Sequence, residues 1–333
     1  MQVTELLVDP SVADPGLAGS GGHDLLQPLG FVDLDTCPHD TRLGALPPFP
    51  LIGLGDPAHP LAGVLDALVE GPVSAEALVR QTLRAPRAAA VVVQLLRSLE
   101  GLAVDRALRL ESMCYGLLQG SAEHQEWLAA RGAPVRAPAP MRDQVPAPAG
   151  TLEIQRQGSM LQLAINRPWA HNAIDCPLRD QLFEAFTIAT LDSEVRSINL
   201  RSVGPTFSVG ADLDEFGTTR DPATAHLIRS LTLPALAIAR HTGILDVHVQ
   251  GACVGSGLEM AAFAGRVTAS ARAWFQLPEL AMGLIPGAGG CVSVPRRIGR
   301  QRAALMILSG RRINAPTALR WGLIDAIQEL ERV

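Results

Sequence analysis

The spacing of apolar residues predicts helices in the first part of the chain. Helical periodicity covers residues 61–70, 87–99 and 106–118. Two further helices are predicted to start after the N-cap serines Ser74 and Ser121, and the second of them to end at Gly132. Residues 50–55 form a short apolar run that predicts a buried strand. Residues 1–49 are rich in Gly, Pro and Asp, which predicts loops with at most short strands.

From residue 151 onward the pattern predicts strands alternating with helices, which is an α/β layout. The predicted strands cover residues 160–165, 198–202, 246–249, 266–269 and 273–276, and the predicted helices cover 177–190, 258–264, 300–309 and 316–321. Before them, residues 132–150 are dominated by Pro and Ala, and a linker of this composition spans roughly 50 Å. The predicted organisation is therefore a leader (1–49), a helical region (50–132), a linker (133–150) and a core (151–333).

Composition narrows the possible functions. The chain has 333 residues, 47% of them apolar, so it can bury a large core. Its net charge is −5, and all 28 basic residues are arginine. The absence of lysine excludes Schiff-base catalysis and a P-loop, and the acidic balance argues against a nucleic-acid partner.

The compartment is predicted from cysteine usage and from targeting signals. Five scattered cysteines without a C-x-x-C pair indicate reduced thiols in the cytoplasm, and they predict no metal site. The N-terminus does not read as a signal peptide, and no apolar run reaches the ~18–20 residues of a membrane span.

Three glycine-bearing turns and two carboxylates are the candidate chemistry. The turns are Phe207–Asp212 and Gly251–Glu259, each after a predicted strand, and Gly283–Gly290, which follows Glu279. Small residues let backbone N–H groups approach a ligand, and two N–H groups that meet at one oxygen form an oxyanion hole. Glu259 and Glu279 lie at predicted helix starts. Taken singly, each feature also fits an ordinary turn or a helix N-terminus, where carboxylates are favoured anyway.

Together these segments resemble the crotonase (enoyl-CoA hydratase/isomerase) superfamily. The motifs F-S-V-G-A-D, G-A-C-V-G-S-G-L-E-M-A, F-Q-L-P-E and G-L-I-P-G-A-G-G occur in the family's order. The resemblance covers about 170 residues, from the N-R-P segment at 164–173 to the segments at 308–313 and 318–323. It implies a spiral of ββα units and an acyl-CoA substrate. It also implies no cofactor beyond the CoA or carrier-protein thioester, and a homo-oligomer, either a trimer or a dimer of trimers.

The resemblance also implies roles for individual residues. The N–H groups of Ala211 and Ser256 would polarise the thioester carbonyl. Glu259 would position and deprotonate water, while Glu279 would exchange the proton at Cα. Arg167 and Arg131 would meet the CoA phosphates, and the acyl pocket wall would lie between residues 216 and 236. Further substrate or CoA contacts are implied for Trp169, Ala170, Asn172, Ala173, Val209, Gly210, Asp212, Gly255, Pro278 and Gly287.

Several reactions are compatible with this resemblance. Two acids favour addition of water to a 2-enoyl thioester, or the reverse elimination. Double-bond isomerisation would need Glu279 alone as the proton shuttle. Thioester hydrolysis and cofactor-free oxygenation are further branches of the family. A non-catalytic relative that keeps the fold for assembly is a different class of function, and retention of both glutamates argues against it.

The helical region before the linker suggests a permuted order. Family members normally continue about 60 residues past the glycine turn near residue 323, into helices that cover the CoA. Residues 88–97, 108–116 and 120–132 resemble those helices. The chain would then be a crotonase whose C-terminal helices stand first and pack on the core. A winged-helix-like module over 60–104 is the alternative interpretation, although its few dispersed basic residues argue against DNA binding.

Overall fold

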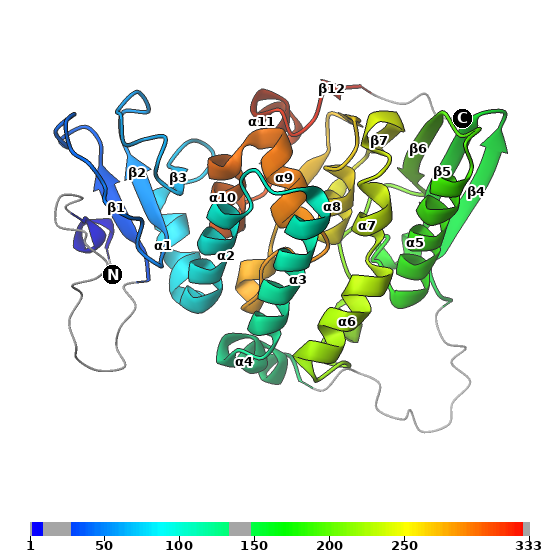
Figure 1. The fold of residues 1–333 in the computed structure, drawn as a ribbon, viewed down its shortest axis with the longest axis horizontal. Helices are drawn as coiled ribbons and strands as arrows, with labels where there is room; N and C mark the ends of the chain where they lie inside the picture. The colour runs from blue at the N-terminus through cyan, green and yellow to red at the C-terminus, as the bar shows by residue number, and fades with distance from the viewer. Residues whose placement is uncertain (1, 9–27, 133–147, 329–333) are drawn as a thin grey trace.

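The computed structural model describes residues 2–8, 28–132 and 148–328, and the two parts separated by the linker lie side by side in it (Figure 1). The first part begins with a 3-10 turn, η1 (Val3–Leu6), and a parallel three-stranded sheet. Its strands are β1 (Gly30–Asp33), β2 (Leu51–Leu54) and β3 (Ala67–Leu68), in that order. Four helices follow: α1 (Ala75–Arg84), α2 (Pro86–Ser98), α3 (Val104–Gln119) and α4 (Ala122–Arg131).

The two predicted N-caps of this part are confirmed. The Ser74 hydroxyl accepts a hydrogen bond from the Ala77 N–H at 3.3 Å, and the Ser121 hydroxyl accepts one from the His124 N–H at 3.3 Å. These bonds satisfy N–H groups that a helix start leaves without a partner. The strand predicted over 50–55 and the helices predicted over 87–99 and 106–118 are confirmed as β2, α2 and α3.

The helix predicted over 61–70 is wrong. These residues form turns that lead into β3, which pairs in parallel with β2. The carboxylate of Asp66 is buried, accepts the Leu51 N–H at 2.9 Å and forms an ion pair with Arg97 at 2.5 Å. Because these partners come from β2 and α2, tertiary contacts decide the conformation of this segment against its helical periodicity.

The second part contains a six-stranded sheet in the order β12-β9-β7-β6-β5-β4. A hairpin of β4 (Thr151–Gln157) and β5 (Met160–Asn166) is antiparallel, and the other neighbours are parallel. The remaining strands are β6 (Ser197–Ser202), β7 (Leu245–Val249), β9 (Arg266–Ala269) and β12 (Ala326–Ile327). The sequence predicted the central strands but not β4, whose side chains are mostly exposed and lack a clear apolar alternation.

A smaller sheet and a set of helices complete the second part. β8 (Ala252–Val254), β10 (Trp274–Gln276) and β11 (Ile313–Asn314) form the small sheet, with β10 in the middle. The α-helices are α5 (Cys176–Leu191), α6 (Pro222–Thr232), α7 (Pro234–Ile238), α8 (Ser256–Ala261), α9 (Gly290–Ile298), α10 (Arg300–Ser309) and α11 (Ala315–Trp321), and the 3-10 turns are η2 (Pro168–Ala170), η3 (Leu213–Glu215), η4 (Thr242–Ile244) and η5 (Glu279–Met282).

The two parts share one hydrophobic core. Buried side chains of α2 and α3, such as Val92, Leu96 and Leu108, belong to the same cluster as Leu305 and Met306 of α10. In Figure 1, α2 and α3 lie against the second part, where α1 and α2 pack on α10 and α3 packs on α6 and α9. The predicted packing of the first helices on the core is therefore confirmed, while their permuted origin stays a prediction.

The remaining sequence predictions concern the linker, the cysteines, membrane spans and metal sites. Residues 133–147 of the linker lie outside the described residues. All five cysteines are free thiols. Within the described ranges, no helix has the length and apolarity needed to cross a membrane, and no cluster of His, Cys, Asp or Glu has the arrangement of a metal site.

Candidate active site

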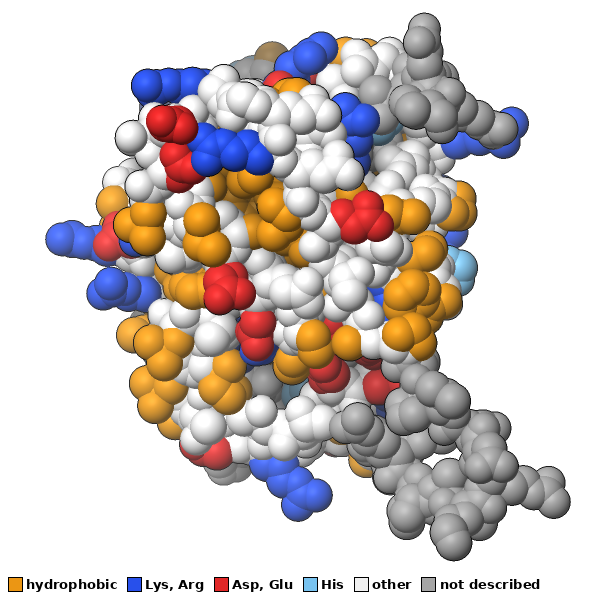
Figure 2. Space-filling view, turned by 90° about the vertical axis from the view of Figure 1, so that its right-hand side faces the viewer, with side chains coloured by type: hydrophobic (Ala, Val, Ile, Leu, Met, Phe, Trp, Pro, Cys, Tyr) orange, Lys and Arg blue, Asp and Glu red, His pale blue; other side chains and the backbone are white. Residues whose placement is uncertain are grey.

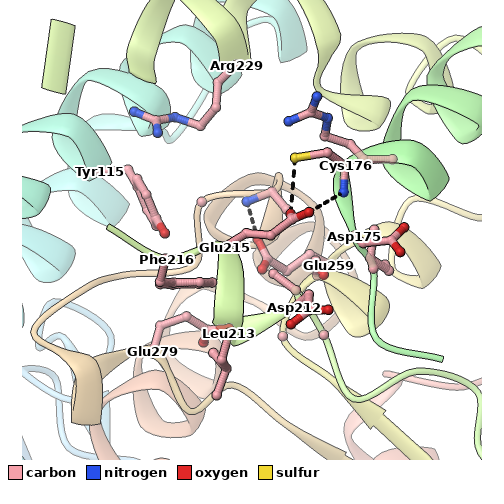
Figure 3. A pocket seen from close by; sticks show the side chains of 18 of the residues that line it. Tyr115, Asp175, Cys176, Asp212, Leu213, Glu215, Phe216, Arg229, Glu259 and Glu279 are labelled. Carbon is pink, nitrogen blue, oxygen red and sulfur yellow. Dashed lines mark hydrogen bonds between the residues drawn. The ribbon is translucent and has the colours of Figure 1, made fainter. Parts of the chain in front are cut away.

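A cavity of about 270 Å³ lies where the two parts of the chain meet. Its walls come from α3, from the turn after Phe207, from α6 and from the start of α8. The segment 278–288 closes another side. Figure 3 shows Glu259 and Glu279 at the base of this cavity, with Tyr115 and Arg229 on one side and Cys176 on the other. The polypeptide thus brings both predicted acids into one enclosed space.

Glu259 is held by the glycine turn that precedes α9. Its Oε2 atom accepts hydrogen bonds from the Ala288 N–H at 2.7 Å and from the Gly290 N–H at 2.8 Å. The side chain is 2% exposed. A Cβ atom on Gly290 would lie 2.6 Å from the Glu259 Cγ, so this position must be glycine. One carboxylate oxygen is therefore fixed by the backbone.

Glu279 has a different environment. It is the first residue of η5 and is also buried, and its Oε2 atom has no hydrogen-bond partner among the described residues. A buried polar atom without a protein partner costs free energy, and such atoms are retained where a ligand supplies the partner. The free oxygen of Glu279 is thus available to a bound molecule.

Burial raises the pKa of both acids. It raises the pKa of Glu259 to about 7, against the opposing effect of the Ala288 and Gly290 N–H groups. Burial and the nearby charge of Glu259 raise the pKa of Glu279 well above its usual value. The two carboxyls titrate as a coupled pair, in which the backbone bonds favour the ionised form at Glu259 and the proton at Glu279. Such a pair has a base and an acid side by side.

The two predicted oxyanion donors also meet at this cavity. Ala211 follows Gly210, and Ser256 is the first residue of α8, where N–H groups lack intrahelical partners. A Cβ atom on Gly210 would lie 3.6 Å from the Ser256 nitrogen, so the two turns are in contact. Among the described residues, neither N–H has a hydrogen-bond acceptor. Both are therefore available to a carbonyl oxygen.

Most of the implied contacts line the cavity, and so do residues of the segment 216–236, whose role as the acyl wall stays a prediction. The lining includes Val209, Gly210, Asp212, Gly255, Pro278 and Gly287, together with Phe216, Ile228 and Leu233 of the predicted wall. The N-R-P segment does not line it. Trp169 is half exposed on η2, and neither Ala170 nor Ala173 is among the lining residues.

The structure gives Arg167 and Asn172 different contacts from the predicted ones. Arg167 forms ion pairs with Asp212 at 2.7 Å and Asp175 at 3.3 Å, which commits its charge inside the protein. Asn172 is fully buried, and its amide donates to the carbonyls of Val203 and Thr206. Both residues hold the Ala211 turn in place and neither is among the residues that line the cavity, while their contact with CoA stays a prediction. Arg131 pairs with Asp214 at 2.7 Å on an exposed part of α4, and its contact with CoA stays a prediction.

Sequence reasoning did not single out the side chains that α3 adds to the site. Tyr115 and Gln119 line the cavity, and Glu111 lies behind it. Glu111 is fully buried and accepts the Gly289 N–H at 2.7 Å and the Cys291 N–H at 2.8 Å. These partners are nearly 180 residues away in the chain, so no local pattern could have indicated the contact.

With this geometry in view, comparison with known proteins decides the family. The family model described as enoyl-CoA hydratase/isomerase matches residues 155–333, which is more than half of the chain. The chain belongs to the enoyl-CoA hydratase/isomerase family. The resemblance drawn from the glycine motifs is thereby confirmed, and so is the α/β crotonase-like fold.

Individual relatives within the enoyl-CoA hydratase/isomerase family are hydratases by name. The chain is 33% identical over 179 residues to a mevalonyl-coenzyme A hydratase of Beauveria bassiana, a match that covers 51% of this chain and 64% of that protein. It is 33% identical over 176 residues to the 2,3-dehydroadipyl-CoA hydratase of Escherichia coli, covering 53% and 68%. The chain thus spans less than two thirds of the first of these relatives.

A solved structure gives the same result for the fold. The crystal structure of an enoyl-CoA hydratase/isomerase from Marinobacter aquaeolei aligns with a TM-score of 0.50 at 28% identity. The alignment covers 54% of this chain and 71% of that one.

Proposed function

We propose that this protein hydrates the double bond of a 2-enoyl-CoA, or catalyses the reverse elimination. One observation carries the proposal: two buried acids, one favouring its charged form and one its proton, share a cavity with two backbone N–H groups that have no acceptor within the described part of the chain. An isomerase needs only one proton shuttle, so the second acid favours hydration. The names of the two hydratase relatives support the same reaction.

The proposed mechanism uses each group once. The Ala211 and Ser256 N–H groups donate to the thioester oxygen and stabilise the enolate that forms. Glu259 takes a proton from water, and the hydroxyl adds to Cβ. Glu279 gives its proton to Cα, so the atoms of one water molecule are added across the double bond. In this mechanism the reacting groups are side chains and backbone N–H groups of this chain and the thioester substrate.

The direct test is turnover of crotonyl-CoA, or a panel of longer 2-enoyl-CoA thioesters, followed by loss of the enoyl absorbance and identification of the 3-hydroxyacyl product. Conversion of a 3-enoyl-CoA to the 2-enoyl isomer without hydration would contradict the proposal. Equal rates with a carrier-protein thioester would identify the carrier as the alternative acyl donor.

Glu279→Gln gives a sharper prediction for one of the two acids. A saturated acyl-CoA cannot be hydrated, but the wild-type enzyme is expected to exchange its α-proton for deuterium through Glu279. In the variant this exchange should fall at least about 10²-fold, because the amide cannot carry the proton. Proton NMR of butyryl-CoA in D₂O measures it. Undiminished exchange would show that Glu279 does not act at Cα.

We further propose a homo-oligomer, a trimer or a dimer of trimers, as in the sequence prediction. Large apolar side chains are exposed on neighbouring helices: Leu117 on α3, Ile188 and Leu191 on α5, and Leu227 and Leu231 on α6. Figure 2 shows orange groups on the face that includes β4 and α5. Exposed apolar groups of this kind support burial against another copy. Sedimentation analysis tests it.

A further inference from the structure

One wall of the cavity is polar where an enzyme for plain alkyl chains would be apolar. It combines Tyr115 and Gln119 of α3 with Arg229 of α6. Tyr115 is the single tyrosine in the chain. Figure 3 shows Tyr115 beside Phe216, and Cys176 on the other side of the view. A thioester whose carbonyl is bound by the Ala211 and Ser256 N–H groups would have its acyl group in the same cavity, because these two residues also line it.

Tyr115 stands beside the turn that holds Glu259. A Cβ atom on Gly287 would lie 2.1 Å from the Tyr115 ring, so the aromatic ring occupies the space that a side chain at 287 would take. Figure 3 shows the Tyr115 hydroxyl directed into the cavity. Among the described residues, no group is hydrogen-bonded to that hydroxyl. A tyrosine on a cavity wall normally has a hydrogen-bond partner for its O–H, and a molecule bound in the cavity can supply one here.

Arg229 lies next to Tyr115 and makes the Tyr115 hydroxyl a stronger hydrogen-bond donor. Its guanidinium carbon lies 4.6 Å from the centre of the Tyr115 ring. It donates to neutral oxygens, the Ser112 hydroxyl at 3.0 Å, the Ser112 carbonyl at 3.1 Å and the Gln119 side chain at 2.8 Å. No carboxylate of the described part lies within ion-pair distance of it. A cation over the ring strengthens the hydroxyl as a donor, and burial raises the pKa of Tyr115, which keeps it protonated.

We propose that Tyr115 is a specificity-determining residue that donates a hydrogen bond to an oxygen on the acyl chain of the substrate. The substrate class is then a 2-enoyl thioester whose acyl group carries a hydroxyl, carbonyl or carboxylate oxygen. The inference rests on the proposed hydration and deepens it. Its chemical basis is that a substrate without the acceptor would cover the Tyr115 hydroxyl and leave this donor unpaired, which penalises binding of that substrate.

The test compares three substrates of equal length: hex-2-enoyl-CoA, its analogue with a terminal hydroxyl, and its analogue with a terminal carboxylate. We expect the wild type to have kcat/KM at least about 10-fold higher for an oxygenated analogue than for the alkyl substrate. Tyr115→Phe keeps the ring and its packing. It should reduce the ratio of kcat/KM between the oxygenated and the alkyl substrates to about 1, because the hydrogen-bond donor is lost while the ring is kept.

The arms separate the possible outcomes. A higher kcat/KM for the carboxylate analogue would show that the charge of Arg229 also contributes to binding. A higher kcat/KM for the hydroxyl analogue would show that the acceptor for Tyr115 is a neutral oxygen. Both results support the proposal. Equal wild-type rates for all three substrates, or an equal loss for all three in Tyr115→Phe, would overturn it. Hydration of none of the three would instead count against the proposed function.

A second, independent observation concerns Glu111. Four consecutive N–H groups at the start of α9 bind two carboxylates in alternation: Ala288 and Gly290 donate to Glu259, and Gly289 and Cys291 donate to Glu111, all at 2.7–2.8 Å. Two carboxylates therefore hold this turn in place through hydrogen bonds. We infer that Glu111 is a positioning residue, which fixes the turn so that the turn can fix the Glu259 carboxylate.

Glu111→Gln tests this inference because glutamine has the same size but only one acceptor atom. The rate of hydration should fall about 10-fold or more, since one N–H of the turn loses its partner and Glu259 loses its fixed position. Exchange of the α-proton of butyryl-CoA, which relies on Glu279, should stay within about threefold. Glu111→Asp, which keeps two acceptor oxygens, should recover part of the hydration rate.

A merely structural role for Glu111 would lower both activities together. That result, or full hydration activity in a folded Glu111→Gln variant, would overturn the inference. Circular dichroism and thermal melting verify that each variant is folded.

Discussion

Glu259→Gln is expected to lower the rate of 2-enoyl-CoA hydration by at least about 10²-fold while the protein stays folded. The amide is nearly the same size as the carboxyl, and its oxygen can still accept the Ala288 and Gly290 N–H groups. What it loses is the ability to take a proton from water. Steady-state kinetics with a verified substrate measures the effect, and wild-type turnover by the variant would remove Glu259 from the mechanism.

The pH dependence of the wild type follows from the same pair. Hydration requires Glu259 ionised and Glu279 protonated, so kcat/KM should rise through an acid limb near pH 7 and fall at higher pH. The limbs belong to the coupled pair and not to either residue alone. In Glu259→Gln the acid limb should disappear from the residual activity. A wild-type profile that is flat from pH 5 to about 9 would contradict the assigned roles.

Glu259→Gln should lower the activity but raise the stability of the folded protein. The pKa of Glu259 is higher in the folded chain than in the unfolded chain, so ionisation of Glu259 favours unfolding. The contribution of protonated Glu259 to the free energy of unfolding is complete below its pKa in the unfolded chain, about 4.5. This contribution is lost as the pH rises to about 7. Glu259→Gln has no such loss. Melting temperatures at pH 5 and pH 8 should therefore show a gain for the variant only at the higher pH.

Removing the first part of the chain should have the largest effect on the fold. A fragment of residues 151–333 is expected to be insoluble or aggregated, because it exposes the apolar surfaces of α9 and α10 that α1, α2 and α3 cover. It also leaves the Gly289 and Cys291 N–H groups without Glu111. Size-exclusion chromatography with light scattering measures the outcome.

Two controls separate loss of contacts from loss of connectivity. Residues 1–132 added as a separate chain should restore a soluble complex and activity, because the contacts between the parts are non-covalent. Doubling the Pro/Ala-rich linker in the full chain should cost only about 0.6 kcal/mol, since it changes only the loop length. A monodisperse and fully active 151–333 fragment would show that the first part is an independent module.

The family, the candidate active site and most of the helices could be predicted from local features of the sequence. Glycines at 210, 255 and 287 and the two acids are local features in a fixed order. They could be identified because backbone approach to a ligand admits little besides glycine and proton transfer requires a carboxyl at a given place. The N-caps Ser74 and Ser121 were predictable for the same reason, since a cap is satisfied within three residues.

Tertiary structure alone decided what depends on distant partners. In the sequence, Glu111 is one polar residue on a predicted helix. Only folding brings it to the turn after Pro286. The segment 61–70 is helical in its periodicity, yet pairing with β2 and the Asp66 contacts make it a strand and turns. The ion pairs of Arg167 with Asp175 and Asp212 likewise join residues that the sequence pattern did not connect. In each case a buried charge or backbone group is paired with a partner elsewhere in the chain, which offsets the cost of burying it, and spacing along the sequence does not encode that pairing.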